Sequence, residues 1–179
     1  MNDNPDFKKR AEKRGKSMSD YWPLVSLVLI AAALGCAIIY RTDGGMTEWM
    51  HYFMGFFLCI FGMLKIFTPS AFADGFQMYD ILAMRFRPYA YIYPYIELGL
   101  GLAYLSFIFP LITYTLTILV MMFGATGVVF ALMRGLDINC PCMGSVLKVP
   151  LSTVTLTENI GMAVMAAIML EIGGTYGFL

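Results

Sequence analysis

The chain has 179 residues, of which 59% are hydrophobic and 13% are charged, with a formal net charge of zero and a mean hydropathy of +0.71. This composition holds more apolar surface than one soluble core could hide, so lipid must solvate much of the chain. A membrane β-barrel is excluded as well, because barrel strands alternate apolar with polar residues and the sequence has no such alternation. The composition therefore predicts an all-α integral membrane protein.

Five long apolar runs follow one another along the chain, each close to the ~20 residues that a helix needs to cross ~30 Å of hydrocarbon. The runs are Tyr21 to Tyr40, Glu48 to Phe67, Tyr89 to Phe109, Leu111 to Met133 and Thr153 to Leu170. One such run could be a buried helix of a large soluble protein, but five in a short chain predict membrane-spanning helices. The segment between the second and third runs carries Asp80, Arg85 and Arg87, so we expect it at the membrane interface.

The first run follows a basic tail, residues 1–20, so a secretory signal peptide has to be considered. Its hydrophobic part is too long for a typical signal, and Ala33-Leu34-Gly35-Cys36 only faintly resembles a lipoprotein cleavage site. We therefore expect residues 21–40 to form an uncleaved first transmembrane helix.

The basic residues are distributed unevenly between the two sides of the predicted helices. Eleven of the twelve, six of them in the tail, fall on one side when the helices are counted alternately, and Arg41 falls on the other. Short loops rich in Lys and Arg stay in the cytoplasm, so we expect the N-terminus and the loop 135–152 to be cytoplasmic and the C-terminus to lie outside. The tail could instead bind nucleic acid, but beside a membrane helix a contact with lipid headgroups is the better interpretation.

The four cysteines differ in their settings. Cys36 and Cys59 lie within apolar helices, where a lone cysteine is most often a small packing residue. Cys140 and Cys142 flank Pro141 in a polar loop, so two thiols one residue apart can face the same ion or exchange partner. This spacing fits a soft ion such as Cu(I), or a strained disulfide that cycles with the dithiol. An inert loop is the plainer alternative, although exposed free cysteines are open to oxidation.

Three charged residues fall within predicted membrane helices on the side of the Cys-Pro-Cys loop. Glu97 and Glu158 lie very roughly 13 and 8 Å from the cytoplasmic edge at 1.5 Å per residue, and Lys65 ends the second run on the same side. Charged groups inside a membrane are costly, so each marks a candidate site, and we expect the three to meet as acid, counter-ion or substrate contact. A Lys–Glu pair that only stabilises helix packing is an equal alternative.

Two further expectations concern the single histidine and the glycines. His51 is the only histidine in the chain, so a cage of imidazole ligands is excluded and a surface role is expected. Small residues allow close contact between membrane helices. We expect such contacts at Gly55, Gly62, Gly99, Gly101, Gly124 and Gly127.

An ordered set of residues in this chain resembles the MauE branch of the DoxX-like membrane proteins. The set comprises Phe53-Met54-Gly55-Phe56-Phe57, Phe61-Gly62, Lys65, Tyr79-Asp80, Pro94, Glu97, Gly101, Cys140 to Gly144, Leu147-Lys148-Val149-Pro150 and Glu158-Asn159. The resemblance covers about Trp49 to Leu170 and leaves the first helix outside it.

The resemblance implies a compact four-helix membrane domain over residues 48–172, with one added N-terminal helix, in a bacterial inner membrane. Members of the family are associated with methylamine utilisation, where they are thought to help the thiol–disulfide maturation of the dehydrogenase small subunit. Relatives occur beside or fused to heavy-metal-binding domains. By position, the family's paired cysteines fall on Cys140 and Cys142, and its intramembrane acids fall on Glu97 and Glu158.

Two main classes of function remain open. The first is a membrane thiol-redox component, in which the Cys-Pro-Cys loop exchanges with a thioredoxin-like partner while the three charged residues tune protonation. The second is a carrier of copper, mercury or another thiophilic ion, with Cys36 and Cys59 as further stations and a heavy-metal-binding domain as partner. A protein that only holds such a partner at the membrane is a third alternative. A loop in the reducing cytoplasm favours electron import or metal handling over direct oxidation of exported proteins.

Overall fold

The computed structural model describes residues 21–133 and 151–176, and it describes side chains over 21–133 and 155–173. Regular structure in this part of the chain is entirely helical, which confirms the predicted all-α membrane class. The helices are α1 Trp22–Thr42, α2 Met46–Phe67, α3 Pro69–Phe76, α4 Ile81–Arg85, α5 Arg87–Ser106, α6 Pro110–Met133 and α7 Leu151–Tyr176.

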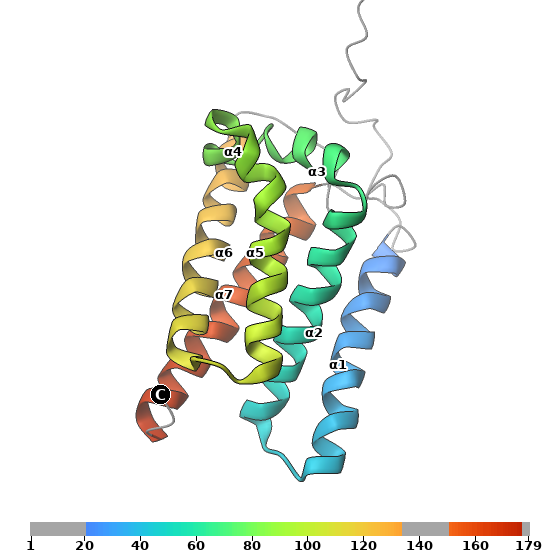
Figure 1. The fold of residues 1–179 in the computed structure, drawn as a ribbon, viewed down its shortest axis with the longest axis vertical. Helices are drawn as coiled ribbons and strands as arrows, with labels where there is room; N and C mark the ends of the chain where they lie inside the picture. The colour runs from blue at the N-terminus through green and yellow to red at the C-terminus, as the bar shows by residue number, and fades with distance from the viewer. Residues whose placement is uncertain (1–20, 134–150, 177–179) are drawn as a thin grey trace, which may run out of the picture.

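The five long helices run up and down side by side and correspond to the five apolar runs of the sequence (Figure 1). Four are long and apolar enough to cross a membrane, namely α1, α2, α6 and the Thr155–Gly173 part of α7. α5 has 20 residues as well, but its composition is more polar because it includes Arg87 and Glu97. It packs against α2, and its charged groups have protein partners, since Glu97 pairs with Lys65 of α2 and Arg87 pairs with Asp74 of α3. The protein is therefore a multi-pass membrane protein.

The helices pack most extensively in pairs, α2 with α5 and α6 with α7, and these four form the core of the bundle. α1 packs on the outer side of α2 (Figure 1). Of the residues of α1, Ala31 and Gly35 are buried, and the position of a Cβ on Gly35 is 3.2 Å from the Trp49 ring. This arrangement agrees with a four-helix core and one added N-terminal helix.

Glycines allow the backbones of α2 and α5 to touch. A Cβ on Gly55 would lie 3.0 Å from the carbonyl oxygen of Gly101, and a Cβ on Gly101 would lie 2.9 Å from the amide nitrogen of Cys59. Gly62 also lies against the backbone of α5, whereas Gly124 lies against the side chain of Asn159 and Gly127 against the carbonyl oxygen of Tyr79. The expectation was wrong for Gly99, because no described atom of another helix lies within 4 Å of its Cβ position. Two residues along a helix turn a side chain to nearly the opposite face, so Gly99 points away when Gly101 points inward.

The short helices α3 and α4 cover the end of the bundle at which α2 ends and α5 begins (Figure 1). Asp80 caps α4, since its Oδ1 accepts hydrogen bonds from the amides of Leu82 at 3.0 Å and Ala83 at 2.8 Å. Burial raises the pKa of the Asp80 carboxyl, and these two hydrogen bonds oppose that shift. The segment does more than lie at an interface, because Phe72 and Phe76 of α3 are buried in the core.

Candidate functional site

Lys65 lies in the last turn of α2, and its side chain is 3% exposed. Its Nζ lies 2.5 Å from both carboxylate oxygens of Glu97, which is 1% exposed and comes from the middle of α5. The same Nζ lies 3.9 Å from Oε1 of Glu158, a buried residue of α7. The prediction that these three side chains meet is confirmed, and we call them the charge cluster. Their catalytic role remains a prediction.

Two aromatic rings lie close to the ammonium group of the charge cluster. The Nζ of Lys65 lies 5.8 Å from the ring centroid of Phe72 on α3 and 5.4 Å from that of Tyr93 on α5, distances at which a cation is attracted by the ring face. Neither aromatic residue was among the site residues predicted from the sequence. Tyr93 could have been found, because it precedes Glu97 by four residues and so shares its helix face. Phe72 comes from α3, which the apolar runs did not predict.

Taken by themselves, the three side chains of the cluster carry one positive and two negative charges if both acids are ionised. A charge inside a membrane protein needs partners, because an unbalanced one is costly. Lys65 contacts Glu97 with both carboxylate oxygens and Glu158 at a longer distance. Of the two acids, Glu158 is therefore the one that lies farther from the ammonium group.

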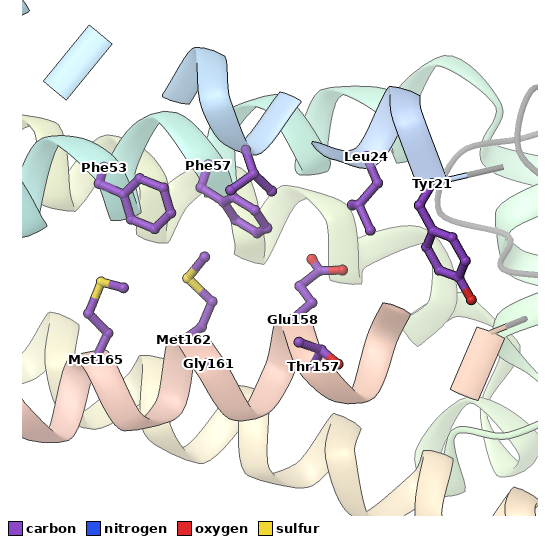
Figure 2. A pocket seen from close by; sticks show the side chains of 10 residues that line it. Tyr21, Leu24, Phe53, Phe57, Thr157, Glu158, Gly161, Met162 and Met165 are labelled. Carbon is purple, nitrogen blue, oxygen red and sulfur yellow. The ribbon is translucent and has the colours of Figure 1, made fainter. Parts of the chain in front are cut away.

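A cavity of about 360 Å³ opens between α1, α2 and α7 and reaches the charge cluster at Glu158. Its lining is mostly apolar. Figure 2 shows the Glu158 carboxylate extending from α7 toward α1, with Met162 and Met165 following it along the same face of α7. The lining residues are Tyr21, Leu24, Val28, Phe53, Phe57, Thr157, Glu158, Gly161, Met162 and Met165. One acid of the cluster is thus reachable from the space beside α1.

The predicted site residues Cys140 and Cys142 lie outside the described residues. In the sequence they fall between Met133, the last residue of α6, and Leu151, the first residue of α7. Both of these ends are on the side of the bundle that carries α3 and α4 (Figure 1). The charge cluster lies toward the same side, because Lys65 is in the last turn of α2.

Cys36 and Cys59 do not come together in the structure. Cys36 is exposed on α1, and the Nε1–H of Trp49 donates to its Sγ at 3.2 Å. Cys59 is half-buried on α2, ten residues beyond Trp49, which is about 15 Å along the helix axis. The two thiols therefore cannot hold one ion between them.

The expected surface role of His51 was wrong, because this side chain is 4% exposed. Its Nδ1 donates to the carbonyl oxygen of Tyr104 at 3.3 Å, so its Nε2 accepts from the Tyr114 hydroxyl at 2.5 Å. Phe107 ends α5 in a left-handed conformation with φ of 54°, and its ring stacks on the imidazole at 4.3 Å between centroids. His51 also lines a second cavity, of about 350 Å³, together with Glu48, Pro110 and other residues.

The sequence profile of one family, described as methylamine utilisation protein MauE, matches residues 43–171. No curated protein and no solved structure matches the chain. The matched range begins after α1 and covers α2 to most of α7, including the three residues of the charge cluster and the Cys-Pro-Cys segment. Because this range is most of the chain, the protein belongs to the MauE family of membrane proteins.

Proposed function

We propose that the protein is a thiol-redox component of a bacterial inner membrane, which relays thiol–disulfide exchange through Cys140 and Cys142 during the maturation of a partner protein. The observation that carries the proposal is the charge cluster of Lys65, Glu97 and Glu158, buried toward the end of the bundle at which α6 ends and α7 begins. Membership in the MauE family, described as methylamine utilisation proteins, supports a role in methylamine utilisation.

The chemistry of exchange explains why a protonatable cluster would be useful there. A thiolate attacks a disulfide sulfur, so the attacking thiol must first lose its proton, and the thiol that leaves must regain one. In the complete reaction, two S–H bonds of the partner's dithiol break and the partner's S–S bond forms, while the disulfide between Cys140 and Cys142 becomes a dithiol. Two electrons and two protons pass from the partner to this protein. Glu158 serves as the proton acceptor and donor, and Lys65 balances the negative charge.

In this proposal the partner is a thioredoxin-like protein on the cytoplasmic side, and the distribution of basic residues supports a cytoplasmic loop. A cytoplasmic loop meets reduced thiols, so the relay carries reducing equivalents away from the cytosol. The competing function is a carrier of a soft ion such as Cu(I), which would use the same two cysteines as thiolate ligands.

A trapping experiment separates the two functions. Replacing Cys142 with serine removes the resolving thiol, so Cys140 should accumulate as a mixed disulfide with its partner, visible as a reductant-sensitive adduct on a gel. The variant with serine at both positions is the control and should form no adduct. Stoichiometric Cu(I) in the wild type that is lost in Cys142→Ser, together with no adduct in either single variant, would overturn the redox proposal in favour of the metal carrier.

A further inference from the structure

The second cavity lies at the end of the bundle opposite α3 and α4, where the chain passes from α1 to α2 and from α5 to α6 (Figure 1). Its volume of about 350 Å³ falls within the range of small-molecule sites. The cavity reaches the surface at Glu48, which is exposed, and extends inward to His51, which is buried. The charge cluster lies toward the other end of the bundle, so a ligand of this cavity is independent of the proposed function.

The formal charge beside this cavity is negative. Of the described residues that line it, Glu48 is the only one with an acidic or basic side chain apart from His51. Its Oε2 accepts a hydrogen bond from the Gly45 amide at 2.6 Å, which caps α2. Within the described part of the chain, Glu48 forms no ion pair. Its carboxylate therefore attracts a cation, and it repels an anion that would otherwise suit the amides in the first turn of α2.

The polar side chains deeper in the cavity offer acceptors of hydrogen bonds. His51 donates from Nδ1 to the carbonyl oxygen of Tyr104 and accepts at Nε2 from the Tyr114 hydroxyl, so both of its ring nitrogens are occupied. The Tyr114 hydroxyl uses its one hydrogen on His51, and its oxygen keeps the capacity to accept another hydrogen bond. A cation with N–H donors suits these groups better than a quaternary ammonium, which has none.

The remaining walls of the cavity are aromatic and apolar. Phe107, Pro110 and Met169 line it together with Tyr114. The Phe107 ring is held against the buried His51 ring, with 4.3 Å between the centroids. Aromatic side chains attract organic cations, and the volume leaves room for carbon atoms beside an ammonium group. An inorganic ion would leave the apolar walls without a partner.

We propose that this cavity binds a primary alkylammonium group, with its charge at Glu48 and its carbon chain against Phe107 and Met169. Two sources share this chemistry. One is a free amine in the water at this end of the bundle. The other is the headgroup of phosphatidylethanolamine, because the cavity lies at an end of membrane-spanning helices.

Two acids at this end of the bundle give a matched pair of variants. Glu48→Gln removes the charge and keeps an oxygen for the Gly45 amide, since glutamine and glutamate both serve in a capping box. Asp43→Asn removes the same charge from a residue that does not line the cavity. Asparagine, like aspartate, tolerates the left-handed conformation at this position, where φ is 51°. The pair separates a contact inside the cavity from a general attraction of cations to this end.

The measurement is a fluorine NMR titration of the full chain in dodecyl maltoside, a detergent without an ammonium group. The probe is trifluorobutylammonium, and trifluorobutanol is its neutral counterpart. We expect the alcohol to bind about tenfold or more weakly than the ammonium. The dissociation constant of the ammonium should rise about tenfold or more in Glu48→Gln and stay within about twofold of wild type in Asp43→Asn. Equal binding of the two probes, or equal losses in the two variants, would overturn the inference.

Competition by short-chain lipids distinguishes the two sources of the ligand. If dihexanoyl phosphatidylethanolamine displaces the probe and dihexanoyl phosphatidylglycerol does not, the ligand is the lipid headgroup. If neither lipid displaces a probe that Glu48→Gln releases, the ligand is a free amine. Displacement by both lipids alike, or no binding of the probe to the wild type, would contradict an alkylammonium site in this cavity.

Discussion

Replacing Lys65 with methionine tests the charge cluster directly, because the change keeps a long side chain and removes its charge. Lys65 pairs with Glu97 at 2.5 Å and with Glu158 at 3.9 Å, so the variant removes the cation from two buried ion pairs. Breaking a buried pair by removal of one partner typically destabilises a protein by ~3 to 5 kcal/mol. In a chain of this size 1 kcal/mol shifts the melting temperature by ~2 to 4 °C, so we expect a fall of ~6 to 20 °C.

Glu97→Gln should lower the melting temperature less, because Glu158 remains near Lys65 and can balance it. The double variant Lys65→Met/Glu97→Gln should be more stable than the sum of the single effects predicts, since it leaves fewer unpaired charges. The assay is thermal unfolding of the purified protein in one detergent, followed by a thiol-reactive or tryptophan signal.

The matched control uses the exposed pair of Arg87 and Asp74, whose Nη2 and Oδ1 lie 2.7 Å apart with side chains 57% and 47% exposed. An exposed ion pair contributes ~0 to 1 kcal/mol, so Arg87→Met should move the melting temperature by at most a few degrees. Equal shifts in Lys65→Met and Arg87→Met would mean that Lys65 does not belong to a buried charge cluster.

Three other predictions follow from the sequence and the fold. An impermeant thiol reagent should label Cys142 in opened cells and not in intact ones, and rapid labelling from outside would reverse the orientation. Burial raises the pKa of the Asp80 carboxyl, so the folded protein binds the proton of this group more tightly than the unfolded chain does. The contribution of Asp80 to stability is therefore largest at low pH and declines as the pH rises through the raised pKa. Asp80→Asn keeps a capping oxygen, so the melting temperature of this variant should depend less on pH between about pH 4 and about pH 7, with no loss of stability at the higher pH. An unchanged pH dependence would show that another group is responsible. Gly101→Ala should destabilise the protein by ~1 to 3 kcal/mol through contact with the α2 backbone, whereas Gly99→Ala should be neutral or stabilising. Equal melting temperatures of the two variants would mean that α2 and α5 do not touch at Gly101.

The spanning helices could be predicted from the sequence because the bilayer imposes their length and composition. The first four apolar runs end within three residues of the helices that the structure contains, and α7 extends to Tyr176 beyond the predicted Leu170. The meeting of Lys65, Glu97 and Glu158 could be predicted for a related reason. A charged side chain in hydrocarbon needs a partner, and these three fall at similar depths on the same side.

The tertiary structure decided which side chains are buried and which helices lie beside one another. His51 was expected at the surface, yet it is buried because Phe107 turns back over it and Tyr104 and Tyr114 satisfy both of its ring nitrogens. Gly99 and Gly101 are the same residue type, but Gly101 lies against α2 and Gly99 does not, because α2 touches one face of α5. The cavity that Glu158 reaches exists because α1 packs on α2 beside α7, and the sequence of each helix alone does not specify which helix will stand beside it. Apolar length determines that a segment crosses the membrane, whereas the choice of neighbours depends on contacts between residues far apart in the chain.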